Sequence, residues 1–367
     1  MNAYVVDRKA LEQNIQVLRE KAGNTPIYGV MKGNGYGLGL IPMAQVLRAD
    51  GIDRFAVTGL EEVCALRDGG FSEEEILMMR ATCIPEELEV LLEKNATATV
   101  GSLECAQAME QVAEQAGKTF PCHIKIDTGM GRYGFLPEQL EEIQQVYSLS
   151  HLQVTGIYTH FHSAFSSEKD TRAQFAAFTG VLDKLAAVGY DLGTRHCCNS
   201  SAFLKYPEMY LDGVRLGSAL LGRLSFPGDL GLQKIGWCRS QVELIRELPK
   251  GHTVGYGAAW KAKRPTKIAV CGVGYFHGFG AEKGNDLFRF RDCLRGGLGY
   301  VKAFLKKKAF YVSVNGKPAR VLGHIGMVQT IFDVTDIPVK VGDPVRIEIN
   351  PLLVKGMDVT YEYISKK

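Results

Sequence analysis

Long apolar runs are missing from this sequence. No stretch of about 18 uncharged apolar residues occurs, and the N-terminus, MNAYVVDRK, lacks the apolar core of a signal peptide. These absences argue against membrane insertion and export. We therefore expect a soluble, cytoplasmic chain with no membrane partner of its own, and a membrane domain preceding Met1 would be compatible with it.

The sequence also lacks a large net charge of either sign. The formal net charge of +3 is too small to indicate a nucleic-acid partner. The one dense basic run, Lys306, Lys307 and Lys308, is typical of a solvated face. Because 46% of the residues are hydrophobic and 23% are charged, the composition is that of a globular protein with ample material for a core.

Cysteine patterns typical of a metal site or a disulfide framework are also missing. The nine cysteines are an odd number without C-x-x-C spacing, and Cys197 and Cys198 are adjacent. We therefore expect reduced thiols, as in a cytoplasmic protein. His160 and His196 lack metal-ligand spacing too, so no metal is expected.

The first 220 or so residues alternate short β-branched runs with amphipathic segments, which is the pattern of a (β/α)8 barrel. The expected strands are residues 3–6, 27–31, 55–58, 76–79, 98–100, 122–126, 154–158 and 195–198. The expected helices are residues 9–22, 41–49, 61–68, 85–93, 103–116, 137–147 and 173–187. A doubly wound open sheet is the rival, but the early glycine loop is not G-x-G-x-x-G and no acidic residue is placed for a ribose.

After residue 224, strand-like runs follow one another with turn signals at Asn315-Gly316 and Gly342-Asp343. The runs are residues 241–246, 267–273, 310–314, 317–322, 327–334 and 344–349, with one helical segment near 298–306. The predicted fold class is therefore α/β: an N-terminal TIM-type barrel in residues 1–224 and a C-terminal all-β domain in residues 225–367.

Lys32 ends the apolar run PIYGVMK and is followed at once by GNGYGLG, a loop with four glycines. A lysine placed where a buried strand opens into such a loop lies on rigid backbone and faces a cavity, which is where a Schiff-base amine has to lie. Desolvation there lowers a lysine pKa and supplies the neutral amine that attacks an aldehyde. The alternative is a surface lysine in an ordinary βα turn.

Further polar residues follow the expected strands, at the end where such barrels carry their chemistry. They are Lys125 and Arg132 in and around KIDTGMGR, His160 in YTHFH, Asn199 and Ser200 in CCNSS, and Arg215 in GVRLG. Each alone fits a structural role, but together they describe a polar pocket. In the β-domain, Tyr256 lies between two glycines that would expose its phenol, with a buried aromatic in a turn as the alternative.

Pieces along nearly the whole chain resemble the alanine racemase family, pyridoxal 5'-phosphate (PLP) enzymes with a barrel and a C-terminal β-domain. The pieces are VMKGNGYGLG, KIDTGMGRYGF, GIYTHF, CCNSSA, GVRLGSALLG, TVGYGAAW, VGYFHGF and LGHIGMVQ. The set in this order is specific, whereas no single piece is.

The resemblance implies a role for each matching residue. Lys32 holds PLP as a Schiff base, and Tyr256 is the second acid/base. The cofactor contacts are Tyr36, Ser200, Gly217 and Ser218 for the phosphate, Arg215 for the pyridine nitrogen, Arg132 for the phenolic oxygen, and His160 and Asn199 beside them. The substrate contacts are Arg132, Tyr275 and Met327, and Lys125 matches a lysine that is often carbamylated. Asn350 is a further candidate for substrate contact, in a segment where this sequence departs from the family pattern. In the family the β-domain of one subunit completes the barrel site of the other, so the resemblance also implies a homodimer with composite active sites.

Racemisation removes a proton from one face of Cα and returns it to the other, so two bases on opposite sides of the cofactor serve better than one. Lys32 and Tyr256, from different domains, suit that demand. A phenol needs cationic neighbours to act as a base at neutral pH, and His160 and Arg215 are candidates. Because an arginine cannot give up its proton, Arg215 would keep the ring nitrogen unprotonated and discourage side reactions such as transamination.

Departures from the family pattern concern the substrate. Val328 and His277 stand where the family usually has Asp, and the ending INPLLVKGMDVTYEY lacks the usual tyrosine at the site entrance. Candidates for its place are Asn350, Met357, Tyr361 and Tyr363. This ending resembles the racemase domains of VanT-type serine racemases, which are linked to vancomycin resistance. We expect the protein to racemise alanine and serine and so to supply D-amino acid for peptidoglycan precursors. The alternative functions are a barrel-type PLP decarboxylase and a degenerate PLP-binding regulatory protein.

Overall fold

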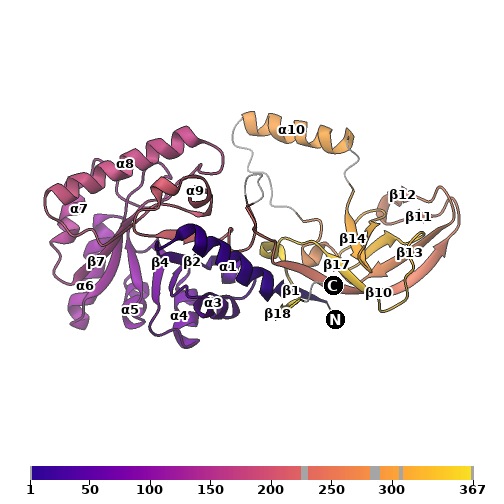
Figure 1. The fold of residues 1–367 in the computed structure, drawn as a ribbon, viewed down its shortest axis with the longest axis horizontal. Coiled ribbons are helices and arrows are strands. Elements are labelled where there is room, and N and C mark those ends of the chain that lie inside the picture. Colours follow the sequence, from indigo (N-terminus) through magenta and orange to yellow (C-terminus); the bar gives the residue numbers. More distant parts are fainter. Residues whose placement is uncertain (1, 225–229, 282–289, 306–308, 365–367) are drawn as a thin grey trace. The chain divides into compact units, whose positions relative to one another are not determined.

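The computed structural model describes residues 2–224, 230–281, 290–305 and 309–364. The chain divides into two units, one formed by Asp7–Ile235 with Tyr363–Lys367 and the other by Met1–Val6 with Gly236–Glu362. Figure 1 shows both units coloured along the sequence. The basic run at Lys306, Lys307 and Lys308, and the expected domain boundary at residue 225, lie outside the described residues.

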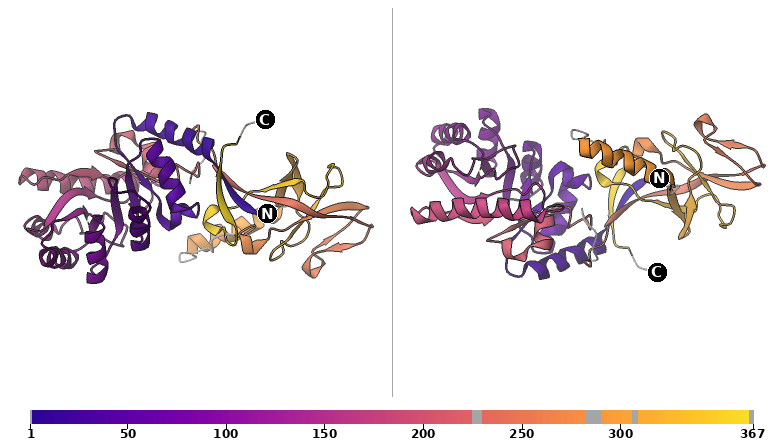
Figure 2. Two further views of the ribbon diagram at one scale, coloured as in Figure 1. Left: turned by 90° about the horizontal axis from the view of Figure 1, so that it is seen from below. Right: turned by 90° about the horizontal axis from the view of Figure 1, so that it is seen from above.

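The larger unit is a ring of parallel strands with helices around it (Figure 2). The strands are β2 (Ile27–Val30), β3 (Arg54–Val57), β4 (Glu75–Ala81), β5 (Thr97–Val100), β6 (Phe120–Lys125), β7 (Leu152–Tyr158), β8 (Thr194–His196) and β9 (Val214–Leu216). They pair in the order β8-β7-β6-β5-β4-β3-β2-β9, and a parallel bridge between His196 and Gly213 joins the two ends. The predicted barrel is confirmed.

The helices of this unit connect successive strands, and several begin after a residue whose side chain caps the first turn. They are α1 (Arg8–Ala22), α2 (Lys32–Tyr36), α3 (Leu40–Ala49), α4 (Leu60–Asp68), α5 (Pro85–Glu93), α6 (Leu103–Ala116), α7 (Leu140–Tyr147), α8 (Glu168–Ala187) and α9 (Ser200–Lys205), with a 3-10 turn η1 (Pro207–Met209). The side chains of Asp7, Ser102 and Ser167 accept hydrogen bonds from the first turns of α1, α6 and α8.

The smaller unit is mainly antiparallel sheet, which confirms the predicted β-domain. Its strands are β1 (Ala3–Asp7), β10 (Gly236–Leu248), β11 (Thr253–Val254), β12 (Trp260–Lys261), β13 (Thr266–Cys271), β14 (Tyr311–Val314), β15 (Lys317–Arg320), β16 (Thr330–Asp333), β17 (Pro344–Ile347) and β18 (Asp358–Glu362). Its helical segments are η2 (Tyr256–Ala258), η3 (Tyr275–His277), α10 (Phe290–Leu305) and η4 (Pro351–Leu353). Helix α10 begins earlier than residue 298, where the sequence pattern placed it.

The first strand was assigned to the wrong sheet by the sequence pattern. Ala3–Asp7 does not enter the barrel but pairs antiparallel with β10, with Ala3 opposite Arg239 and Val6 opposite Gly236. A short apolar run signals a buried strand without saying which sheet it joins. The remaining barrel strand is β9, whose three residues are too few to show a period.

The expectation of reduced thiols is wrong for one pair of cysteines. Cys83 and Cys105 form a disulfide, with Cα atoms 4.6 Å apart. Neighbouring strands β4 and β5 bring these two positions together, although 22 residues separate them in sequence. Cys122, Cys197, Cys198, Cys238 and Cys271 are buried thiols. Among the described residues, no helix combines the length and the apolar character needed to cross a bilayer.

Candidate active site

Lys32 follows the last residue of β2 by two positions, at the carboxyl end of the barrel strands. Gly33 and Gly35 adopt left-handed conformations, with φ of 66° and 64°, which are strained for residues with a side chain. The Gly35 N–H donates to the Met31 carbonyl at 2.7 Å, and the Glu62 carboxylate accepts from the Asn34 N–H at 2.9 Å. These contacts fix the backbone on both sides of Lys32.

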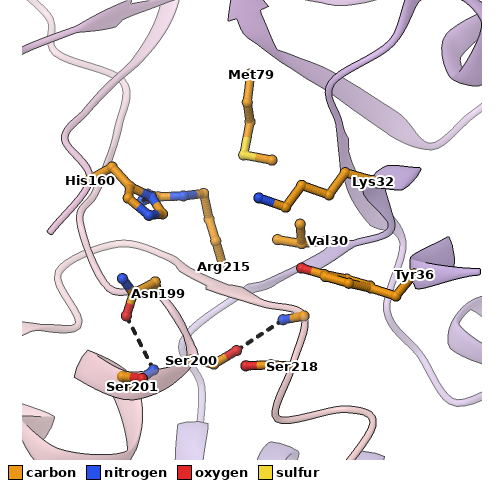
Figure 3. Close-up of a pocket in the computed structure, with 11 residues that line it drawn as sticks. Val30, Lys32, Tyr36, Met79, His160, Asn199, Ser200, Ser201, Arg215 and Ser218 are labelled. Carbon is orange, nitrogen blue, oxygen red and sulfur yellow. Dashed lines mark hydrogen bonds between the residues drawn. The ribbon is translucent and has the colours of Figure 1, made fainter. Parts of the chain in front are cut away.

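Lys32 points into a cavity of about 170 Å³ (Figure 3). The residues that line this cavity are Val30, Lys32, Tyr36, Met79, His160, Asn199, Ser200, Ser201, Arg215, Gly217 and Ser218. They follow β2, β7, β8 and β9 or lie within β2, β4 and β9, so the barrel brings together side chains that are far apart in sequence. Of the residues that the sequence singled out as cofactor contacts, all but Arg132 line this cavity.

Hydroxyl groups and backbone N–H groups collect on one side of the cavity. The Ser200 Oγ accepts from the N–H of Gly217 at 3.0 Å and of Ala219 at 3.3 Å, while the Asn199 side chain caps α9 by accepting from Ser201 and Ala202. A Cβ built on Gly217 would collide with the Tyr36 hydroxyl, so only glycine lets that hydroxyl reach the same place. Such a cluster of donors suits a phosphate group.

Arg215 lies across the cavity from Lys32 and is only 2% exposed. Its Nη2 donates to the Thr159 carbonyl at 2.7 Å and lies 3.4 Å from His160 Nδ1. Because a guanidinium has donors only, Arg215 offers a fixed positive charge and N–H groups to a ring nitrogen. Burial, together with the charges of Arg215 and Lys125, lowers the pKa of His160 well below its usual range. His160 is therefore neutral at neutral pH, and the expectation that it supplies a cationic field to the phenol is wrong.

A second cavity, of about 250 Å³, adjoins the first because both are lined by Lys32, Met79 and His160. It holds Lys125 and Arg132, the two ends of the KIDTGMGR segment, together with Thr58, Arg80, Tyr133 and Tyr158. Asp127 shapes that segment by accepting from the N–H groups of Gly129, Met130, Gly131 and Arg132 at 2.7 to 3.2 Å. The cavity is strongly basic, which suits a carboxylate.

Two lysines of the site have depressed pKa values. Burial, with the charges of Arg132 and Arg215, lowers the pKa of Lys32. The same causes lower the pKa of Lys125 to about 8, and its amine faces the rings of Tyr133 and Tyr158. Both groups therefore supply neutral, nucleophilic amine at a lower pH than an exposed lysine does.

Tyr256 and Met327 lie together in the smaller unit. They line a cavity of about 570 Å³ with Leu244, Gly255, Val270, His324, Gly326, Val328, Gln329 and Ile331. Tyr256 is 82% exposed, because Gly255 and Gly257 hold it on the short turn η2 with φ of 78° and 64°. The buried aromatic considered as the alternative is therefore wrong.

Hydrogen bonds within the smaller unit hold three further residues that the sequence singled out, Tyr275, His277 and Asn350. The Tyr275 N–H donates to the Gly326 carbonyl at 2.9 Å, which ties Tyr275 to the segment before Met327. His277 is buried and its Nδ1 accepts from the Gly274 N–H at 3.1 Å. The Asn350 side chain caps η4 by accepting from Leu352. His277 and Asn350 thus have local structural partners.

Sequence reasoning missed several lining residues. Met79, Arg80 and Tyr158 lie within β4 and β7, and Thr58, Tyr133 and Ser201 follow β3, β6 and β8 in the chain. A polar residue at the end of an expected barrel strand is the signal that could have found Thr58 and Arg80.

The fold and the cavity define a class of protein. A lysine amine at the carboxyl end of a (β/α)8 barrel, a hydroxyl and N–H cradle on one side and a buried arginine on the other are the features of a barrel-type PLP enzyme with an added β-domain. Among the described residues no cluster of side chains suited to a metal ion occurs.

Comparison with known proteins narrows the class to a family. Residues 6–225 match the model of the alanine racemase N-terminal domain, and residues 237–351 match that of the C-terminal domain. The chain is 33% identical over 353 residues to an alanine racemase of Methanococcus maripaludis, covering 93% of this chain and 87% of that protein. It is 35% identical over 351 residues to one of Desulforamulus reducens, covering 93% and 88%. The solved alanine racemase of Clostridium difficile 630 has a TM-score of 0.82 at 26% identity, with 96% of this chain and 93% of that chain covered. The chain belongs to the alanine racemase family, whose members are PLP-dependent racemases.

Proposed function

We propose that this protein interconverts L- and D-alanine, with Lys32 and Tyr256 as the two bases. The observation that carries the proposal is the desolvated Lys32 amine in a cavity that has a donor-rich cradle on one side and Arg215 on the other. Tyr36, Ser200, Gly217 and Ser218 would hold the phosphate of PLP, and Arg215 would face its ring nitrogen. Bound PLP supplies a conjugated ring that takes up the electron pair left when the α-proton of an amino acid is removed.

The remaining steps belong to this chain's own residues. Arg132 would draw the substrate carboxylate into the second cavity and so orient the α-proton along the axis of a base. Lys32 Nζ would carry the proton on one face of Cα and Tyr256 Oη on the other, so that removal by one and return by the other inverts the centre. The walls of Met79 and Val30 would limit water at the amine.

We also propose that Tyr256, Tyr275 and Met327 reach the Lys32 cavity from a second copy of the chain. Tyr256 is largely exposed within its own unit, as a side chain must be if it acts on another subunit. Met327 and Val328 line the same cavity as Tyr256. A homodimer of this kind has two composite sites related by a two-fold axis.

Serine is proposed as a second substrate. L-serine differs from L-alanine by one hydroxyl, and an apolar pocket discriminates against an added hydroxyl by only about 100-fold. In an assay with added PLP and a panel of L-amino acids, coupled to D-amino-acid oxidase, we expect turnover of L-alanine and of L-serine within about 100-fold of each other in kcat/KM. Good turnover of L-alanine with none of L-serine would remove the serine assignment. Absence of both would remove the proposed function.

Lys125 is proposed to carry a carbamate. Its neutral amine would attack carbon dioxide, forming an N–C bond and releasing one proton to solvent, and the resulting anion would pair with Arg132. Because burial lowers the pKa of Lys125 to about 8, we expect the modification to form readily near pH 8. With ¹³C-bicarbonate, wild-type protein should show a carbamate signal by NMR that Lys125→Met lacks. Identical spectra for both proteins would rule the modification out.

A further inference from the structure

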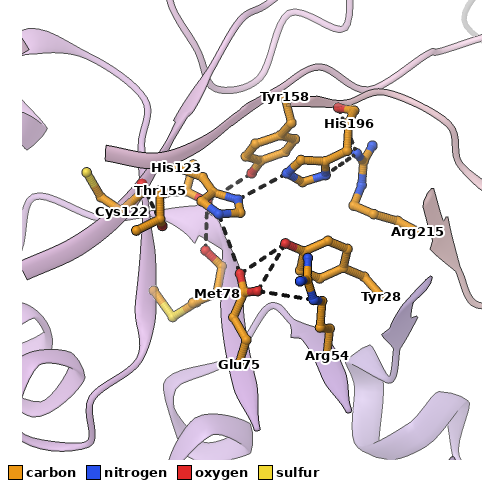
Figure 4. A network of polar contacts seen from close by, with 11 residues as sticks. Tyr28, Arg54, Glu75, Met78, Cys122, His123, Thr155, Tyr158, His196 and Arg215 are labelled. Atoms are coloured by element: carbon orange, nitrogen blue, oxygen red, sulfur yellow. Dashed lines mark hydrogen bonds and ion pairs between the residues drawn. The ribbon is translucent and has the colours of Figure 1, made fainter. Parts of the chain in front are cut away.

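A chain of polar side chains continues from Arg215 through the interior of the barrel, away from the cavity (Figure 4). Arg215 Nη1 lies 2.8 Å from Nδ1 of His196, on β8. Nε2 of His196 lies 3.0 Å from Nδ1 of His123, on β6. Nε2 of His123 lies 3.4 Å from Oε1 of Glu75, the first residue of β4. The chain therefore runs from the site to the opposite end of the strands.

The direction of these contacts is fixed by their two ends. Arg215 has donors only, so Nδ1 of His196 must accept and the proton of neutral His196 must be on Nε2. That proton is donated to Nδ1 of His123, whose own proton must then be on Nε2 and be donated to Glu75. Burial and the charge of Arg215 lower the pKa of both histidines, that of His123 to about 3. Each ring is therefore neutral and has a single allowed tautomer.

Glu75 is held as an acceptor by its neighbours. Both of its oxygens lie 3.1 Å from the Tyr28 hydroxyl, and Arg54 Nε lies 3.9 Å from Oε2. Burial raises the pKa of Tyr28, so its hydroxyl keeps a proton to donate. Burial also raises the pKa of Glu75, which Arg54 opposes. Even a protonated carboxyl keeps one carbonyl oxygen that can accept from His123.

Packing prevents the rings of His196 and His123 from rotating, so rotation cannot restore the hydrogen bonds if a proton is on the wrong nitrogen. The His196 ring is stacked between Tyr28 and Tyr158, with centroid distances of 5.1 and 4.8 Å and interplanar angles of 13° and 14°. A Cβ on Gly156 would lie 2.6 Å from Nε2 of His123, so glycine at that position is what makes room for the His123 ring. With both rings packed in place, the position of the proton is the remaining variable.

We propose that Glu75 and His123 are positioning residues for Arg215, acting through His196. By accepting the last proton of the chain, Glu75 keeps an unprotonated Nδ1 against Arg215 and so holds the guanidinium where it faces the cofactor. Without that acceptor, His123 can take the proton on Nδ1, His196 must then carry its own on Nδ1, and two donors would confront each other at 2.8 Å. The consequence for catalysis rests on the proposed function, whereas the tautomers do not.

The tautomers are measured on the full chain labelled with ¹⁵N-histidine, with and without added PLP. Long-range ¹H–¹⁵N spectra, assigned with His123→Gln, should show His196 and His123 protonated on Nε2 in the wild type. Glu75→Gln keeps an amide oxygen as acceptor and should preserve this pattern, whereas Glu75→Leu should shift His196 toward Nδ1–H. An Nδ1–H tautomer of His196 in the wild type, or an unchanged pattern in Glu75→Leu, would overturn the proposal.

The same matched pair is compared in the holoenzyme. Glu75→Leu should lower kcat for alanine by about 10- to 100-fold, the range known for partners that orient a metal-ligating histidine. KM should change little, and a larger share of turnovers should end in transamination. Glu75→Gln should stay near wild type. If Glu75→Leu does not fold, His123→Leu and His123→Gln test the same contrast. A wild-type enzyme without racemase activity would refute the proposed function while leaving the spectra to decide the tautomers.

Discussion

Lys32→Ala is expected to abolish both racemisation and covalent attachment of PLP. Loss of the attaching amine, which also serves as one of the two bases, should lower kcat by about 10⁴-fold or more. Gly33 and Gly35 set the local backbone whatever side chain stands at position 32, so the variant should fold. Absorbance spectra of protein purified with excess PLP, before and after borohydride reduction and gel filtration, measure the attachment directly.

Lys94→Ala is the matched control for this experiment. It removes a lysine whose exposed amine pairs with Asp68 at 2.8 Å, away from the residues that line the Lys32 cavity. Its spectrum and turnover should equal those of the wild type. Covalently bound PLP in Lys32→Ala would show that another lysine holds the cofactor, and the assignment of the active site would then be wrong.

The barrel was predictable from the sequence because its main signal is local. Parallel strands covered by helices bury both faces, so apolar runs such as ILMM in β4 stand out between amphipathic helices. The pairing of β1 with β10 was not predictable, because it joins segments more than 200 residues apart and leaves no trace in either run. The disulfide of Cys83 and Cys105 joins the segments that follow the neighbouring strands β4 and β5. It was not predictable because it depends on where two side chains meet, which the spacing of the cysteines does not show.

The cavity around Lys32 was predictable for a related reason. Residues at the carboxyl ends of barrel strands meet in space, so polar residues such as His160, Asn199 and Arg215 could be grouped without coordinates. The chain behind Arg215 was not found, although His123 precedes Lys125 by two residues and therefore shares its face of the strand. Its remaining members, Glu75 and His196, come from β4 and β8, and only their three-dimensional packing shows the contacts.

Tyr256→Phe is expected to separate the two bases. The substitution removes one oxygen from a side chain that is 82% exposed, so the fold and the attachment of PLP to Lys32 should remain. The rate of conversion of L- to D-alanine should fall by about 10²- to 10⁴-fold, which is the usual rate contribution of a positioned acid or base. In D₂O, the enantiomer whose α-proton faces Lys32 should still exchange that proton, without inversion.

Mixed dimers of Lys32→Ala and Tyr256→Phe test whether the two bases come from different chains. In a composite site each inactive subunit supplies what the other lacks, so one of the two sites in a mixed dimer carries both native residues and the other carries neither. After random reassociation half of the dimers are mixed, and each mixed dimer of this two-fold symmetric kind has one intact site of two. Activity should therefore recover to about a quarter of the wild-type level. Because sites built within one chain would stay inactive in every combination, a mixture that remains at the level of the single variants would place Lys32 and Tyr256 in the same subunit.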